Sequence, residues 1–161
     1  MSVTLRNMTA VYLVQGERFL LLYRQGGKVV NQVYTGTAGG HFEKDELGDP
    51  YACILREMEE EIGLTEADVE NLQLRYVAAR YTKGEIRQNF YYFANLPIDA
   101  PEIVSNEGSL CWVDFKDALS LEMPFCAKFA IEHYLKIGRY DSRLYGGCAT
   151  QDGLTFYPMD E

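Results

Sequence analysis

Apolar and other residues alternate along the first part of the chain in a way that is typical of strands. Every second residue from 8 to 14 is apolar, which is the two-residue period of a strand. Residues 19–23 are almost continuously apolar, as in a strand that is covered on both faces. The turn sequence Gln15-Gly16-Glu17 separates the two segments. The pattern therefore predicts a hairpin over residues 4–23.

A second hairpin is predicted near the middle of the chain. Its strands, residues 72–81 and 86–96, are rich in tyrosine, phenylalanine, valine and leucine, and Lys83-Gly84 supplies the turn. Four aromatic residues run together at 90–93. Part of this aromatic surface is a candidate for stacking on a nucleobase, whereas packing within a two-sided sheet is the better interpretation for most of it.

A helical period replaces the strand period between Asp49 and Gly63. Asp49 is a favourable N-cap and Pro50 suits the first helical position, while Gly63 tolerates the left-handed conformation that often ends a helix. Between them, apolar residues recur at intervals of three and four and form a stripe on one face. The stripe consists of Tyr51, Leu55, Met58 and Ile62.

The remaining segments predict further strands and helices. Short strands are expected at 32–35 and 110–115, a helix near Asp117, another helix over 124–137, and a last hairpin within 144–158. Strand-rich segments interrupted by one helix and followed by another indicate a mixed α and β fold. A length of 161 residues fits a single domain, residues 1–161, that buries a substantial core.

Three glutamates share a face of the helix that begins after Asp49. Glu57, Glu60 and Glu61 stand at positions i, i+3 and i+4, away from the apolar stripe, and their charges repel one another. They also lie near the helix C-terminus, where the macrodipole disfavours anions. A bound divalent cation would reverse both effects, and carboxylate oxygens are the ligands that Mg²⁺ and Mn²⁺ prefer. The alternative is a solvated acidic face.

Net charge and composition exclude several classes of partner. The net charge of -9 argues against a nucleic-acid polymer, since no basic surplus exists to displace counterions, but a small phosphate ester bridged by a cation remains possible. The chain contains neither an apolar run that would span a membrane nor a leading signal sequence, so we expect a cytoplasmic location without a membrane partner. The scattered cysteines form no zinc motif. They are Cys53, Cys111, Cys126 and Cys148.

The segment 39–64 closely resembles the signature of the Nudix hydrolase family. Gly40 and Glu46 match its first part, and residues 56–64 match the second part, Arg-Glu-aliphatic-x-Glu-Glu-x-Gly-aliphatic. The spacer between the two parts has nine residues instead of the usual seven, which leaves open whether Glu46 still meets Arg56. The resemblance implies an α+β fold of the α/β/α sandwich type, with a mixed central sheet between helices.

The resemblance also implies a metal site and a general base. The metal would be Mg²⁺, with Mn²⁺ as a substitute, and Arg56 would orient the carboxylates. The base would be Glu60 or Glu107. Residues 107–112, Glu-Gly-x-Leu-x-Trp, are similar to MutT-type members, in which this glutamate reaches the metal site; otherwise Glu107 is an ordinary loop glutamate. The implied ligands are Glu57, Glu60, Glu61 and the Gly40 carbonyl.

Five further residues are candidates for substrate binding. By resemblance, Arg24 faces the phosphates, although an arginine that ends a strand at the surface is as good an interpretation. His41 either faces substrate or makes a local hydrogen bond. Asn31, Gln32 and Asn89 are candidates for hydrogen bonds to the base.

The implied activity is hydrolysis of a pyrophosphate bond in a small nucleotide. Residues 107–112 and the carboxy-terminal helix, which reads Met-Pro-Phe-Cys-Ala-Lys-Phe, look like those of enzymes that convert 8-oxo-dGTP to its monophosphate and pyrophosphate. Dinucleoside polyphosphates and ADP-ribose are alternative substrates. A non-catalytic nucleotide-binding or regulatory module is an alternative of another class, disfavoured because all the signature glutamates are present. The family occurs as monomers and homodimers.

Overall fold

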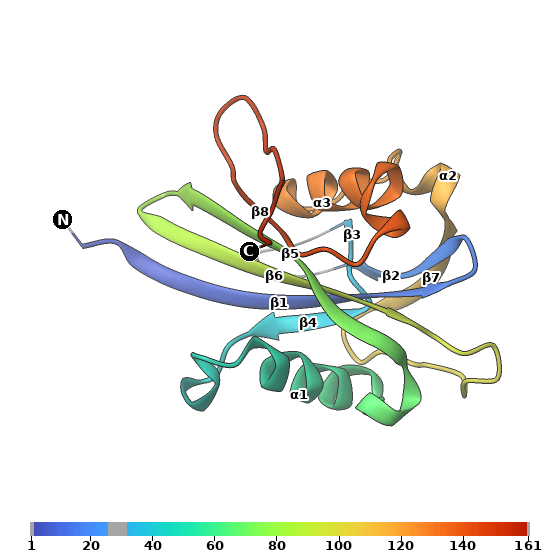
Figure 1. The fold of residues 1–161 in the computed structure, drawn as a ribbon. Helices are drawn as coiled ribbons and strands as arrows, with labels where there is room; N and C mark the ends of the chain where they lie inside the picture. The colour runs from blue at the N-terminus through green and yellow to red at the C-terminus, as the bar shows by residue number, and fades with distance from the viewer. Residues whose placement is uncertain (1, 26–31, 161) are drawn as a thin grey trace.

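A mixed nine-stranded sheet with helices on both faces forms the protein (Figure 1). The computed structural model describes residues 2–25 and 32–160. Its strands are β1 (Thr4–Gln15), β2 (Arg18–Arg24), β3 (Val33–Thr35), β4 (Ala38–His41), β5 (Glu70–Thr82), β6 (Glu85–Asn95), β7 (Ser109–Asp114), β8 (Tyr145–Cys148) and β9 (Tyr157–Pro158). Its helices are α1 (Pro50–Ile62), α2 (Phe115–Ala118) and α3 (Phe125–Lys136).

Both predicted hairpins are confirmed. Strands β1 and β2 pair antiparallel around Gly16, whose positive φ of 61° closes the turn. Strands β5 and β6 pair antiparallel around Lys83 and Gly84, which have φ values of 53° and 76°. Two successive residues with positive φ are what a two-residue hairpin turn requires, because they match the twist of the flanking strands.

Strand β1 joins the two hairpins into one sheet. It pairs parallel with β6 over its length, from Thr4 opposite Glu85 to Val14 opposite Asn95. On its other side it pairs antiparallel with β2 and β4. The resulting order is β3-β2-β1-β6-β5-β8-β9, and β4 and β7 pair with β1 and β2 respectively. Residues from distant parts of the sequence therefore meet side by side on β1 and β6.

Helix α1 covers one face of the sheet, as the capping residues predict. The Asp49 carboxylate accepts a hydrogen bond of 3.0 Å from the backbone N–H of Ala52, and Gly63 ends the helix at a φ of 69°. The predicted stripe is confirmed at Met58 and Ile62, which are buried, but Ile54 is buried in place of Leu55, which is half-buried.

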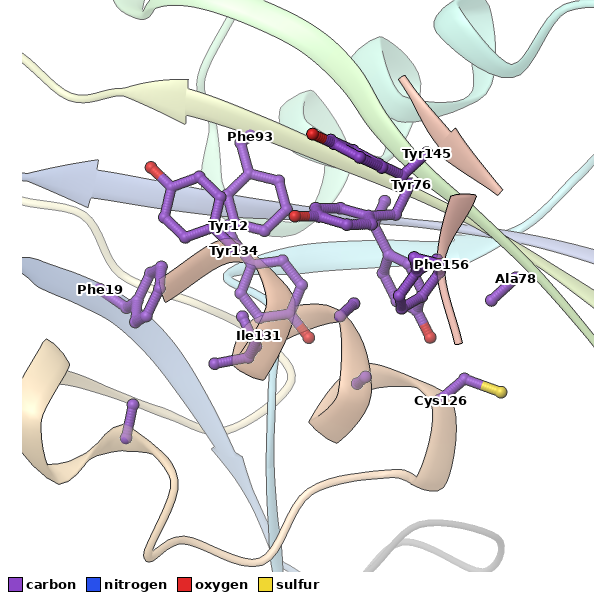
Figure 2. Packing of buried hydrophobic residues seen from close by; sticks show 14 of the residues in the cluster. Tyr12, Phe19, Tyr76, Ala78, Phe93, Cys126, Ile131, Tyr134, Tyr145 and Phe156 are labelled. Atoms are coloured by element: carbon purple, nitrogen blue, oxygen red, sulfur yellow. The ribbon is translucent and has the colours of Figure 1, made fainter. Parts of the chain in front are cut away.

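Helix α3 covers the opposite face, where aromatic side chains dominate the core (Figure 2). Tyr12 and Phe93 stack with 5.2 Å between ring centroids, and Phe93 stacks on Tyr134 of α3 at 4.2 Å. Tyr76 and Phe156 extend the cluster toward the C-terminal segment at 4.9 Å. Such pairs contribute about 0.5–1.5 kcal/mol each beyond their buried area.

The helices and the hairpin predicted for the C-terminal third of the chain are present, with boundaries that differ by a few residues. Helix α2 begins at Phe115, slightly before the predicted Asp117, and α3 begins directly after Pro124. The C-terminal hairpin is confirmed, because β8 and β9 pair antiparallel. In the described parts of the chain, none of the helices has the length and apolarity needed to cross a membrane.

Candidate active site

A cavity of about 690 Å³ lies over strands β1 and β6, and its wall includes carboxylates of α1 and the first turn of α3. Its volume lies within the range of small-molecule sites. Most of the residues predicted for the site line this cavity. They are Arg24, Gly40, His41, Arg56, Glu57, Glu61, Asn89 and Glu107.

The guanidinium group of Arg56 donates hydrogen bonds to three glutamates. Its Nε and Nη2 donate to the two carboxylate oxygens of Glu46, each at 2.8 Å, and its Nη1 donates to Glu57 and Glu60, each at 3.0 Å. Two parallel bonds from arginine to carboxylate form a strong, well-oriented pair. The Arg56 guanidinium holds the pKa of Glu46 at about 2, well below its usual range.

The longer spacer therefore does not break the Glu46–Arg56 contact. A short 3-10 turn (Lys44–Glu46) presents Glu46, whose carboxylate also accepts a 2.8 Å hydrogen bond from the Glu43 backbone N–H. Only 5% of Glu46 is exposed. The exposed residues Leu47 and Gly48 then lead to the N-cap of α1.

Strand β4 brings its glycines directly against the α1 glutamates. The Gly39 backbone N–H donates to the Glu61 carboxylate at 3.2 Å. A Cβ atom on Gly40 would lie only 2.4 Å from Glu57 Oε1, so a glycine is required for this approach. Glu57 is buried, in contrast to the fully solvated glutamate face that remained an alternative in the sequence. Burial raises the pKa of Glu61, and the nearby Glu57 carboxylate adds to this effect.

The loop that carries Glu107 is fixed to the C-terminus of α1. The Asn106 side chain donates to the Glu60 carbonyl oxygen at 3.1 Å, and the Asn106 backbone N–H donates to the Glu61 carbonyl oxygen at 3.3 Å. These carbonyls belong to the last turn of the helix, where intrahelical partners are lacking. Asn106 was not predicted for the site, because its role depends on carbonyl groups far away in the sequence.

Glu107 and Arg24 meet because their strands are neighbours. Strand β7 pairs with β2 so that Ser109 lies opposite Tyr23, and the residues just beyond this pair come together. Arg24 Nη2 donates to Glu107 Oε2 at 3.1 Å. Arg24 is thus at the cavity wall and holds Glu107 there, instead of pointing freely into solvent.

The other predicted residues divide into those at the cavity and those away from it. Asn89 lines the cavity, as does His41, whose Nε2 lies 2.8 Å from Arg6 Nη2. Burial lowers the pKa of His41, and the Arg6 charge lowers it further. Gln32 is exposed just before β3 and is not part of the cavity wall, so its contact with a base stays a prediction. Asn31 lies outside the described residues.

Glu60 differs from the other two signature glutamates of α1. Its side chain is 58% exposed, and it is absent from the cavity wall. It stands beside Arg56 at the rim, while Glu57 and Glu61 face β4. The i+3 spacing placed Glu60 on the correct side of the helix, but it could not show how far β4 covers each carboxylate.

The donor set at Glu57, Glu61 and Gly40 fits a hard divalent cation. All available donors are oxygen atoms, and Gly40 leaves room for the carbonyl and the carboxylates to meet. Burial of the Glu61 carboxylate is unfavourable unless positive charge compensates it, which a cation would supply. Over residues 2–25 and 32–160, no group of three acidic, histidine or cysteine side chains is clustered closely enough to mark a metal site directly. In the structure, the positive charge next to Glu57 and Glu60 is that of Arg56, which forms an ion pair with each of them.

Three arginines at the far end of the cavity were missed by the sequence analysis. Arg6, Arg80 and Arg87 line its wall together with Phe125. They come from three different strands, so only the register of the sheet shows that they are neighbours.

Comparison with known families agrees with the fold. The NUDIX domain model matches residues 4–133, so the chain belongs to the Nudix family. The class of protein is that of the Nudix pyrophosphohydrolases. None of the curated proteins compared with the chain matches it.

Solved structures share the fold at low sequence identity. The mMutator MutT protein from Bacillus halodurans is 24% identical, with a TM-score of 0.66 over 97% of this chain and 99% of that one. A MutT NUDIX hydrolase from Burkholderia pseudomallei is 23% identical, with a TM-score of 0.63 over 80% and 97%. A C. elegans Ap4A hydrolase is 16% identical, with a TM-score of 0.67 over 84% and 99%. At these identities the similarity is one of fold.

Proposed function

We propose that this protein hydrolyses a pyrophosphate bond in a small nucleoside diphosphate derivative and that the reaction depends on Mg²⁺. The main support is the convergence of Glu57, Glu61 and Gly40 with Glu107 at one end of a cavity of nucleotide size. The first candidate substrate from the sequence is an oxidised purine nucleoside triphosphate such as 8-oxo-dGTP. Dinucleoside polyphosphates and ADP-ribose are the alternatives.

The metal would be held by Glu57, Glu61 and the Gly40 carbonyl, with Glu60 joining from the rim. When bound, Mg²⁺ or Mn²⁺ supplies positive charge that polarises the phosphoryl oxygens and acidifies a bound water. Arg56 holds the helix carboxylates in place through its four ion pairs, which are made with Glu43, Glu46, Glu57 and Glu60.

The proton of the attacking water would pass to Glu107. Of the two glutamates that the sequence offers as base, Glu107 lines the cavity and Glu60 does not. Arg24 holds the Glu107 carboxylate by a 3.1 Å hydrogen bond and so fixes its direction toward the cavity. Water would attack phosphorus and lose its proton to Glu107, and the bond from that phosphorus to the bridging oxygen would break, so that the bridging oxygen leaves on the other phosphate product.

A substrate panel tests the reaction. The purified protein is incubated with nucleoside triphosphates, 8-oxo-dGTP, ADP-ribose and diadenosine polyphosphates, with Mg²⁺, with Mn²⁺ and with EDTA, and the products are separated by chromatography. We expect cleavage that EDTA abolishes, with one substrate preferred in kcat/KM. Absence of cleavage with every substrate and metal would contradict the enzyme assignment and favour a non-catalytic nucleotide-binding module.

Replacement of Glu61 by glutamine tests the role of the buried carboxylate. We expect Glu61→Gln to lower kcat by at least about 100-fold, because a metal ligand is lost, while the fold persists. The neighbouring exposed Glu59 supplies the matched control, and Glu59→Gln should retain the wild-type rate. Wild-type turnover by Glu61→Gln in Mg²⁺ would show that this carboxylate is not part of the machinery.

A further inference from the structure

Three arginines stand in a row across neighbouring strands at the end of the cavity remote from α1. Arg6 on β1 lies directly opposite Arg87 on β6, and Arg87 lies directly opposite Arg80 on β5. Residues opposite one another in a sheet point to the same face, and all three side chains line the cavity. Like charges placed this way destabilise a sheet, so the arrangement needs a compensating partner.

The protein itself compensates this row only in part. Glu85 pairs with Arg87 at 2.8 Å and with Arg6 at 3.4 Å, so one carboxylate serves two guanidinium groups. Arg80 lies over the Phe125 ring, 4.3 Å from its centroid. Among the residues with described positions, no carboxylate pairs with Arg80 and no atom accepts a hydrogen bond from it. This end of the cavity therefore carries a local excess of positive charge in a chain whose net charge is -9.

The distance between the three arginines and the carboxylates of α1 is comparable to the length of a nucleotide. Gly40 lies opposite Thr9 on β1, and Arg6 is three residues, roughly 10 Å, further along that strand. Arg80 lies two strands across the sheet from Arg6, which adds roughly 10 Å in the perpendicular direction. A substrate whose pyrophosphate lies at Glu57 and Glu61 is therefore long enough to reach the arginines with its nucleoside.

We propose that Arg6, Arg80 and Arg87 form a subsite for a second phosphate group, carried on the nucleoside side of the substrate and remote from the bond that is cleaved. Guanidinium groups donate several parallel hydrogen bonds to phosphate oxygens, and a phosphate dianion would supply the compensation that Glu85 provides only in part. This inference rests on the proposed function and narrows its substrate. It ranks nucleotides with a phosphorylated ribose above 8-oxo-dGTP.

A binding experiment tests the subsite without requiring turnover. The affinities of adenosine and guanosine 3′,5′-bisphosphates are compared with those of the corresponding 5′-monophosphates by calorimetry, in Mg²⁺. We expect the bisphosphate of the preferred base to bind at least about tenfold more tightly, as charge-assisted contacts to one phosphate permit. Equal affinities within both pairs, or no binding of any of the four, would overturn the proposal.

Variants locate the effect within the row. Arg80→Gln and Arg87→Gln should each remove most of the preference for the bisphosphate while the affinity for the monophosphate stays within about twofold. Arg80→Lys retains the charge and should keep part of the preference. Arg143→Gln is the control, because Arg143 pairs with Asp160 on the surface outside the cavity. Loss of preference in Arg143→Gln to the same degree would contradict the assignment.

Cleavage of matched substrates separates this proposal from the proposed function. Coenzyme A and dephospho-coenzyme A differ by one ribose phosphate, as do NADP and NAD. Preference for the phosphorylated member supports both proposals, and equal cleavage overturns the subsite alone. Discrimination in binding without cleavage of any substrate supports the subsite and contradicts the proposed function. Diadenosine tetraphosphate provides one more comparison. If it binds more tightly than either bisphosphate, and if Arg80→Gln removes this difference, the second phosphate belongs to a longer phosphate chain. That result would overturn the placement of the second phosphate on the nucleoside.

Discussion

Gly40 sets how closely β4 approaches the carboxylates of α1. A methyl group at this position would meet the Glu57 carboxylate at 2.4 Å, so Gly40→Ala must displace either the side chain or the strand. A displacement of about 1 Å in an active site lowers the rate by about 100-fold. We expect Gly40→Ala to lower kcat by about 100-fold. We also expect it to lower the free energy of unfolding, measured by chemical denaturation, by about 1–3 kcal/mol.

Gly48 provides the matched control for this substitution. A Cβ atom there would have no neighbour within 4 Å. Gly48→Ala should therefore leave both kcat and the denaturation midpoint close to wild type. An unimpaired Gly40→Ala enzyme would show that the close approach of β4 to Glu57 has no bearing on turnover.

Glu46 links the site to acid stability. Its pKa in the folded protein is about 2, below the ordinary value of 4.5, because Arg56 stabilises its charged form. The resulting stabilisation is present in full above about pH 5 and is lost as the pH falls from there toward 2. Its magnitude is at most about 3 kcal/mol. Glu46→Gln should lower the free energy of unfolding at pH 7 and reduce its decline between pH 5 and 3.

Urea denaturation at a series of pH values measures this effect. Asp45→Asn, at an exposed position in the same turn, should have nearly wild-type stability over the whole range. A pH dependence in Glu46→Gln identical to that of the wild type would mean that other carboxylates account for the acid sensitivity.

Two elements of the site, the end of helix α1 and the loop 105–108, are held together by a direct contact. Asn106 joins the last turn of the helix to the segment that presents Glu107. Asn106→Ala removes the side-chain bond, which costs about 1 kcal/mol of stability. We expect kcat to fall about tenfold with little change in KM, because Glu107 becomes less well positioned.

Steady-state kinetics with Asn95→Ala as control tests this prediction. Asn95 is an exposed residue at the end of β6 and lies outside the main cavity wall. If both variants lose the same fraction of activity, the contact between the loop and α1 has no specific role.

Local patterns predicted those elements whose signals lie within a few residues of one another. Asp49, Pro50 and Gly63 gave the limits of α1, and the turn residues at 15–17 gave the first hairpin. One member of the stripe was wrong, because Ile54 and Leu55 are both aliphatic and only packing against the sheet distinguishes them.

The parts of the site that the sequence did not reveal depend on long-range pairing. Arg6 and Arg87 become neighbours only through the parallel register of β1 and β6, which no short motif encodes. Asn106 likewise depends on where β7 enters the sheet beside β2. Sequence proximity to the glycines of β4 likewise did not place Gln32 in the cavity wall.

At the scale of the whole molecule, the C-terminal segment is part of the core. The family match ends at residue 133, yet Phe156 packs on Tyr76 and is only 8% exposed. Phe156→Ala should lower the free energy of unfolding by about 3–5 kcal/mol, because a large buried ring is lost. Its neighbour Tyr157 is 67% exposed, so Tyr157→Ala should change stability by less than about 0.5 kcal/mol.

Thermal and chemical denaturation of the two variants gives the comparison. Similar stabilities for Phe156→Ala and Tyr157→Ala would show that the segment after the family match is an appendage and not a structural layer. The parallel pairing of β8 with β5 is a further reason to expect the larger loss.

The parallel pairing of β1 with β6 also determines when the protein can fold during its synthesis. Thr4 pairs with Glu85, so the start of the strand at the middle of the sheet is synthesised roughly 4 to 16 seconds before its partner residue. Until then β1 has nearby partners on one side only, in β2 and β4. Native contacts between such distant residues slow folding, since a long loop must close first. The nascent chain therefore exposes an apolar strand during this interval and depends on its environment to keep that strand from pairing with other chains.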